Sequence, residues 1–383
     1  MKRLYLPQEI IYGQDAIKSA CDSIVGYGNS FLIITDETML KLGLVDKLTQ
    51  TLEGSWTIFS GVTSEPTDAI VNQVLTLMHG QEQPIEALIA LGGGSCIDTA
   101  KAASVMYRNG YSTIPALASA KEFKVSPLPV IAIPTTAGTG SEATDVTVIT
   151  DTQQQIKYMM KDKNFLPKVA IIDPLMTQSS PPSITAATGL DALCHAVESY
   201  ISRKAHALTQ ELSLSAVKAI MHHIVTAYQD GDHLAAREEM ALAALKAGIA
   251  FSNASVTLIH GMSRPIGALF HIPHGFSNAI LMHEVLAYSK PAIIQQLAEL
   301  TQAVYPAFTG TDEEKATYFL QQLEDICQIL SIPTYSDFGV TKEQFTASLD
   351  KMCEDAFASG SPANNPIVPT KDEMKAIYLR SWK

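Results

Sequence analysis

Short apolar runs alternate with amphipathic segments through the first half of the chain. Residues 31–35, 87–91 and 130–133 are strongly apolar, and each run ends at or beside Thr, Gly or Pro. Such runs are typical of strands that are buried on both faces of a parallel sheet. The segments 67–79 and 98–107 have helical spacing instead. The order strand, helix, strand predicts an α/β domain with a parallel sheet.

The pattern changes near residues 179–183, which contain two serines, two prolines and a third serine. The chain beyond this point is rich in Ala, Leu, Glu, Gln and Lys with helical spacing. The clearest segments are 191–203, 208–229, 234–252 and 315–330. We therefore expect two domains, an α/β domain over residues 1–181 and an all-α domain over residues 182–383.

Composition narrows the class of protein. The 383 residues include 27 basic and 39 acidic side chains, a net charge of −12, which disfavours nucleic acid as a partner. The most apolar stretch, 241–259, is interrupted by Lys246 and Asn253, so it predicts a buried helix rather than a membrane span. Pro7 and Glu9 interrupt any export signal, and the five cysteines form no CxxC pair. These features predict a cytoplasmic protein without a membrane partner.

Two loops of the α/β half have the chemistry of a phosphate site. Gly92, Gly93 and Gly94 follow a predicted strand and precede a helix, so backbone N–H groups are open to an anion such as a pyrophosphate. Ser95 with Asp98 also matches a capping box, which would explain the turn without a ligand. The segment 133–142 follows the next strand and gathers hydroxyls and glycines that can donate to a polar ligand.

An acidic residue, Asp36, ends the first of these strands. In dinucleotide-binding folds such a carboxylate accepts from the adenosine ribose hydroxyls and repels a 2′-phosphate. Here it precedes the glycines, whereas the usual fingerprint has it about 20 residues after them. The pattern indicates a Rossmann-like unit of different topology, with a simple helix cap as the equal alternative for Asp36.

The helical half contains a candidate metal-ligand set. Asp191 and His195 stand at i and i+4, so they share one face of a helix. His260, His271 and His274 follow in turns marked by glycine or proline. One carboxylate with two or three imidazoles suits Fe(II) or Zn(II). Spacing leaves open whether these side chains converge, because a lone histidine is more often a surface or core residue.

Together these segments resemble the iron-containing (group III) alcohol dehydrogenases. The matching segments are 35–36, 92–101, 134–142, 189–198, 260–262 and 273–275, in an order that extends over residues 12–366. The resemblance implies a Rossmann-like N-terminal domain, a helical C-terminal domain, and a catalytic metal in the cleft between them. It also implies a homodimer, which is common in the family.

The resemblance assigns roles residue by residue. The metal ligands fall on Asp191, His195, His260 and His274. The dinucleotide contacts fall on Asp36, Gly93, Gly94, Ser95, Asp98, Thr135, Thr136, Thr139, Val148 and Lys157. Asp at position 36 favours NAD over NADP. The resemblance implies Fe(II) as the metal, and the ligand set accepts Zn(II) as well.

Three positions depart from the family pattern. Arg264 stands one helical turn after His260, where many relatives have a second histidine that relays protons, and arginine cannot act as a base near neutral pH. His271 stands where many relatives have Asp or another polar residue, and we expect it or a water chain to take over proton exchange. Arg264 is either an anchor for an acidic substrate or part of a structural ion pair. Glu65 replaces an asparagine near the cofactor, which puts one NAD contact in doubt.

The expected reaction is reversible hydride transfer between a small alcohol and NAD, with the metal as Lewis acid. Two alternatives keep the architecture: a dehydroquinate-synthase-like enzyme, which uses NAD only transiently, and a glycerol-dehydrogenase-like enzyme. Segment 189–195 favours the alcohol dehydrogenases over both. A non-catalytic nucleotide-binding protein is a third alternative, and only the arginine at position 264 speaks for it.

Overall fold

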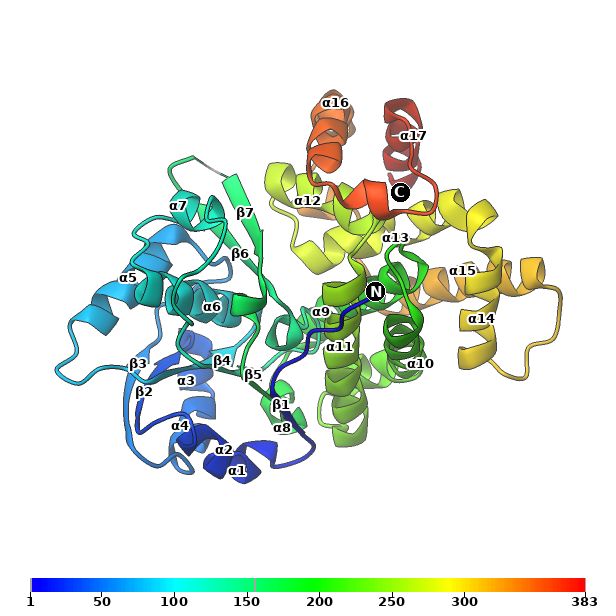
Figure 1. The fold of residues 1–383 in the computed structure, drawn as a ribbon. Coiled ribbons are helices and arrows are strands. Elements are labelled where there is room, and N and C mark those ends of the chain that lie inside the picture. Colours follow the sequence, from blue (N-terminus) through cyan, green and yellow to red (C-terminus); the bar gives the residue numbers. More distant parts are fainter. Residues whose placement is uncertain (1, 155, 383) are drawn as a thin grey trace. The chain divides into compact units, whose positions relative to one another are not determined.

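The computed structural model describes residues 2–154 and 156–382 (Figure 1). The chain forms two compact units. One comprises Leu4–Ser180, and the other comprises the remaining described residues, chiefly the segment that starts at Pro181.

The first unit is built on a six-stranded sheet in the order β1-β8-β5-β4-β2-β3, in which all paired strands are parallel. The strands are β1 (Glu9–Tyr12), β2 (Ser30–Ile34), β3 (Ser55–Phe59), β4 (Ala87–Gly92), β5 (Val130–Pro134) and β8 (Val169–Ile172). A separate antiparallel pair consists of β6 (Val146–Asp151) and β7 (Ile156–Lys161). The predicted parallel α/β architecture is confirmed.

Helices cover both faces of this sheet, and the side chains of each central strand alternate between the two cores. Leu32 and Ile34 pack in one core with residues of α5 and α6, while Phe31 and Ile33 pack in the other with residues of α1 and α4. Both faces are apolar, which is why the strands are continuous hydrophobic runs. The helices of this unit are α1 (Ala16–Ser19), α2 (Cys21–Val25), α3 (Glu37–Lys41), α4 (Leu44–Thr49), α5 (Asp68–His79), α6 (Gly94–Asn109), α7 (Ile114–Ala118) and α8 (Pro174–Thr177).

The second unit is helical, with no strand among its described residues, so the predicted all-α character is confirmed. Its helices are α9 (Pro182–Ile201), α10 (Ala207–Gln229), α11 (Leu234–Ala254), α12 (Leu258–Phe270), α13 (His274–Ser289), α14 (Ile294–Val304), α15 (Asp312–Ile329), α16 (Lys342–Ala358) and α17 (Lys371–Ser381). The central helix α9 is buried along most of its length and packs against α10, α11 and α13. It begins at Pro182, earlier than the predicted 191–203, because proline fits the first turn of a helix.

The prediction of one buried helix over residues 241–259 is wrong. The helix α11 ends at Ala254, Ser255 adopts a left-handed φ of 66°, and α12 begins at Leu258. The two helices are bent by 103° at this break, and they meet the length and hydropathy of a membrane span only when taken together. No single helix among the described residues meets that test.

Candidate metal centre and dinucleotide loops

The three predicted dinucleotide-binding segments follow neighbouring strands. Asp36 comes after β2, the glycine turn after β4, and Thr135 after β5, and these strands lie side by side in the sheet. The carboxyl ends of adjacent parallel strands meet at one edge, where open α/β sheets bind ligands. Thr135 links two of the segments directly, because its N–H donates to the carbonyl of Gly92 at 3.0 Å.

The glycine turn is shaped by close packing against the loop that follows β5. A Cβ on Gly94 would lie 2.9 Å from Cγ2 of Thr139, and one on Gly93 would lie 3.8 Å from the Thr136 side chain. Gly93 is the N-cap of α6, and no side chain caps this helix. The first N–H groups of α6 therefore keep the capacity to bind an anion.

The capping-box interpretation of Ser95 and Asp98 is wrong. The helix begins at Gly94, so Ser95 lies inside it, and its hydroxyl donates to the carbonyl of Ser64 at 2.8 Å. The Asp98 carboxylate instead accepts from Ser141 Oγ at 2.6 Å and from the N–H of Val148 at 3.0 Å. Asp98 thus connects α6 to two other predicted cofactor segments.

Asp36 caps a helix and also lies beside the glycine turn. Its Oδ1 accepts from the N–H groups of Thr38 and Met39, at 2.8 and 3.1 Å, and so caps α3. Its Oδ2 accepts from the Cys96 thiol at 3.9 Å and would lie 3.6 Å from a Cβ on Gly92. The carboxylate is therefore a helix cap that also adjoins the glycine turn.

Lys157 already has an acidic partner. Its Nζ lies 2.6 Å from Oε1 of Glu65, which also accepts from Thr150 Oγ1 at 2.9 Å. Both charged side chains are about half exposed, 53% for Lys157 and 46% for Glu65, so solvent screens the pair. Glu65, one of the residues that depart from the family pattern, is thus the ion-pair partner of Lys157, a predicted cofactor contact.

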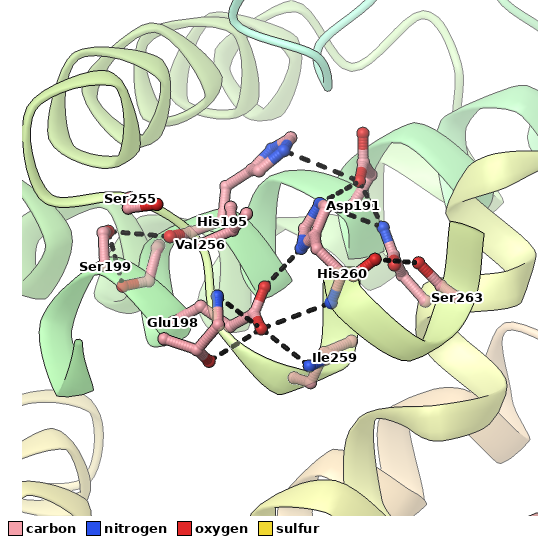
Figure 2. A network of polar contacts seen from close by, with 12 residues as sticks. Asp191, His195, Glu198, Ser199, Ser255, Val256, Ile259, His260 and Ser263 are labelled. Atoms are coloured by element: carbon pink, nitrogen blue, oxygen red, sulfur yellow. Dashed lines mark hydrogen bonds and ion pairs between the residues drawn. The ribbon is translucent and has the colours of Figure 1, made fainter. Parts of the chain in front are cut away.

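In the helical unit the candidate metal ligands converge from three helices. Asp191 and His195 lie on α9 and His260 lies on α12 (Figure 2). His274 is the first residue of α13. Asp191 Oδ1 lies 3.9, 3.4 and 3.6 Å from Nε2 of His195, His260 and His274, respectively. Asp191, His195 and His260 are buried, and one ligand atom from each lies within 4.8 Å of the others.

This donor set fits a divalent cation. Four ligand atoms at tetrahedral bond lengths of about 2.0–2.2 Å stand roughly 3.4 Å apart, close to the three separations from Asp191 Oδ1. Burial lowers the pKa of His195 to about 3, so this imidazole is neutral, as a ligand must be. Burial would raise the pKa of Asp191, but His195 and His274 hold it below its ordinary value, so the carboxylate is ionised.

Two residues of the site were missed in the sequence. Glu198 pairs with Nδ1 of His260. Burial lowers the pKa of His260, but the carboxylates of Glu198 and Asp191 outweigh this effect and raise the pKa to about 9. Asn278 donates to Asp191 at 2.7 Å and lies 3.2 and 3.3 Å from Nε2 of His260 and His274. Helical spacing was the available signal, since Glu198 is three residues after His195 and Asn278 four after His274.

Two further predicted residues, Arg264 and His271, lie on α12 and at its C-terminal end. Arg264 follows His260 by one turn of α12; burial lowers the pKa of its guanidinium, and the negative charge of Glu198 opposes that shift. His271 is exposed and ends α12 in a left-handed conformation, with φ of 56° and its N–H donating to the Gly267 carbonyl at 3.1 Å. Histidine is among the residues that tolerate this conformation, so the position has a structural explanation as well.

Comparison with known proteins gives one family for the whole chain. Residues 7–174 match the model of the iron-containing alcohol dehydrogenases, and residues 185–382 match the C-terminal domain of the same family. Lactaldehyde reductase of Escherichia coli K12 is 33% identical, with 99% of both chains covered. An NADPH-dependent butanol dehydrogenase of Clostridium saccharobutylicum is also 33% identical, over 99% of this chain and 97% of the relative. The crystal structure of a 1,3-propanediol oxidoreductase superposes with a TM-score of 0.93 at 30% identity, covering both chains completely.

Proposed function

Because this chain belongs to the iron-containing alcohol dehydrogenase family, we propose that it interconverts small alcohols and their carbonyl compounds by hydride exchange with NAD(H). The reaction class is that of its named relatives, which include alcohol dehydrogenases, a lactaldehyde reductase and a propanediol oxidoreductase. The observation that carries the proposal in this molecule is the convergence of Asp191, His195 and His260 in one buried cluster.

We assign Asp191, His195, His260 and His274 as the ligands of Fe(II), with Zn(II) as the alternative ion. When bound there, such a cation supplies Lewis-acid polarisation of the alcohol or carbonyl oxygen. Asp191 contributes the negative charge of the ligand set, and the neutral imidazole of His195 contributes a nitrogen lone pair. Asn278 donates to Asp191 and so orients the carboxylate that three histidines face.

The first unit, residues 4–180, is the dinucleotide-binding domain in this proposal. The N-terminus of α6 receives the pyrophosphate, supported by the hydroxyl-rich loop that carries Thr135, Thr136 and Thr139. NAD is preferred over NADP because Asp36 adjoins the glycine turn, where its charge accepts ribose hydroxyls and repels a 2′-phosphate. Val148 and Lys157, on the β6–β7 pair, complete the set of contacts.

Arg264 makes hydroxy compounds with an acidic group candidate substrates. A half-buried guanidinium one turn from His260 would bind a carboxylate or phosphonate through charge-assisted hydrogen bonds. Arg264→Gln is expected to raise KM for acidic substrates more than for neutral alcohols. An unchanged ratio of kcat/KM between the two classes would leave Arg264 with a structural role only.

His271 is the proposed proton-exchange residue, because its exposed position at the end of α12 gives it access to solvent. Histidine is the side chain that most often exchanges protons in enzymes that work near neutral pH. His271→Ala is expected to lower kcat and to change its pH profile, while the metal content stays the same. A variant with the wild-type profile would assign proton exchange to water.

The central test uses apo-protein reloaded anaerobically with Fe(II) or Zn(II). NADH formation is followed with a panel of alcohols and acidic hydroxy compounds, in parallel with NADP. Metal-dependent turnover with a preference for NAD supports the proposal. A folded, metal-loaded protein that is silent with both coenzymes would favour the synthase-like or the non-catalytic alternative, since a synthase returns its hydride and accumulates no NADH.

We also propose that the enzyme is a homodimer in the cytoplasm. The dimer is an expectation from the family, and the cytoplasm follows from the reduced-thiol pattern of the sequence. Sedimentation equilibrium tests the first statement, and fractionation of the source cells tests the second.

A further inference from the structure

We infer that Glu198 is a positioning residue for the metal centre: its carboxylate fixes the tautomer and orientation of His260 and at the same time starts helix α12. The inference rests on the proposed metal site and adds a residue that contacts the ligand His260 rather than the cation. Glu198 is fully buried on α9, one turn beyond His195. Figure 2 shows it between α9 and the first turn of α12.

One oxygen of Glu198 caps α12. Its Oε1 accepts from the N–H groups of Thr257 at 3.0 Å, Ile259 at 2.7 Å and His260 at 3.3 Å, and from Thr257 Oγ1 at 2.8 Å. The first N–H groups of a helix have no acceptor within the helix, and a negative charge there is favourable. No side chain of α12 or of its N-cap supplies this cap. A carboxylate from α9 does so instead, just after the bend between α11 and α12.

The other oxygen of Glu198 orients the imidazole of His260. Oε2 pairs with Nδ1 of this ring, and an ionised carboxylate can only accept, so Nδ1 carries the proton. Nε2, which lies 3.4 Å from Asp191 Oδ1 in the ligand cluster, is therefore the ring nitrogen available to a cation, which must displace any proton held there. Carboxylates that hold the second nitrogen of a ligand histidine commonly raise metal affinity in this way.

Both functions come from one carboxylate, so the position of His260 and the start of α12 are set together. The same helix α9 carries Asp191, His195 and Glu198, so the two ligands and the residue that orients the third ligand form one rigid face. A bond to the backbone alone would fix α12 but leave the tautomer of His260 undetermined. This difference separates a positioning role from a purely structural one.

Two nearly isosteric variants distinguish these roles. In Glu198→Gln the amide loses the charge and can present an N–H₂ group to Nδ1, which disfavours the required tautomer. Thr257→Val removes one hydrogen bond to Oε1 and leaves the contact with His260 intact. We expect Glu198→Gln to weaken Zn(II) binding by about 10–100-fold in a chelator competition assay on the apo-protein. Thr257→Val is expected to lower the thermal midpoint of the apo-protein while leaving the Zn(II) dissociation constant unchanged.

The ring protonation is read directly by ¹⁵N NMR of histidine-labelled, Zn(II)-loaded wild-type protein, with His260 assigned by its loss in His260→Ala. A proton on Nδ1 and coordination through Nε2 support the inference, even if Glu198→Gln does not fold. Coordination through Nδ1 overturns it, as does a Zn(II) affinity that is unchanged in Glu198→Gln or reduced equally in both variants. A wild-type protein that binds no Zn(II) or Fe(II) would overturn the proposed metal site itself, a result distinct from these.

Discussion

Replacing Lys101 with methionine removes a buried charge of the first unit that donates to three residues. Lys101 lies on α6 and is 1% exposed. Its Nζ donates to Ser141 Oγ at 2.9 Å, Thr144 O at 3.0 Å, Thr144 Oγ1 at 3.1 Å and Val146 O at 2.9 Å. Methionine has a similar length and no donor, so the substitution leaves these oxygens without their common partner.

The expected cost follows from burial and charge. Burial lowers the pKa of Lys101 to about 8, although Asp98, Glu142 and Asp145 act in the opposite direction, so the side chain is mainly a cation at neutral pH. Removing one partner of a buried, hydrogen-bonded charge network destabilises a protein by about 3–5 kcal/mol. We expect a loss of that size in the unfolding free energy of this unit. Because the network also anchors the segment that leads to Val148, the affinity for NAD should fall as well.

The assay exploits the two tryptophans of the chain, Trp56 on β3 of the first unit and Trp382 in the second. In a Trp382→Phe background, the fluorescence of Trp56 reports denaturant unfolding of the unit that contains Lys101. Lys41→Met is the matched control, because Lys41 is 76% exposed and its ion pair with Glu37 at 3.9 Å contributes little. A loss below about 1 kcal/mol, or one equal to that of the control, would refute the reasoning.

Three further predictions concern the same unit. Asp36→Asn keeps an acceptor for the α3 cap but removes the charge beside the glycine turn. The ratio of kcat/KM for NADP to that for NAD should therefore rise at least tenfold, with little loss of stability. A constant ratio would exclude Asp36 as the coenzyme selector. Burial raises the pKa of Glu142 from 4.5 to about 7, although Lys101 opposes the shift. The folded chain therefore binds this proton more tightly than the unfolded chain does, so the stability of the fold decreases as pH rises from 4.5 to 7. Glu142→Gln should flatten that part of the stability profile measured by thermal unfolding, and a slope identical to that of the wild type would contradict the assignment. Glu65→Gln should lower KM for NAD a few-fold, because it frees the charge of Lys157 for the pyrophosphate. The lost ion pair costs at most about 1 kcal/mol of stability. An unchanged or higher KM would count against a contact between Lys157 and the cofactor.

The sequence by itself determined the fold class and the family. Strands buried on both faces must be continuous apolar runs, so 31–35, 87–91 and 130–133 were recognisable without any tertiary information. The same is true of the pair Asp191 and His195, because a spacing of four residues places two side chains on one helix face whatever surrounds them. The order of the motifs then identified the iron-containing alcohol dehydrogenases, and comparison with known proteins confirmed that family.

Only the tertiary structure decided which polar groups meet. The sequence predicted one helix over 241–259, because hydropathy does not register that a carboxylate from α9 caps a new helix at Leu258. Ser95 and Asp98 matched a capping box, yet Asp98 bonds to Ser141 and Val148, which are distant in sequence. Hydrogen-bond partners of this kind depend on how elements pack, while local periodicity reports only which face of an element is apolar. For that reason the sequence indicated the candidate ligands, and packing brought His260 to Asp191 and Glu198.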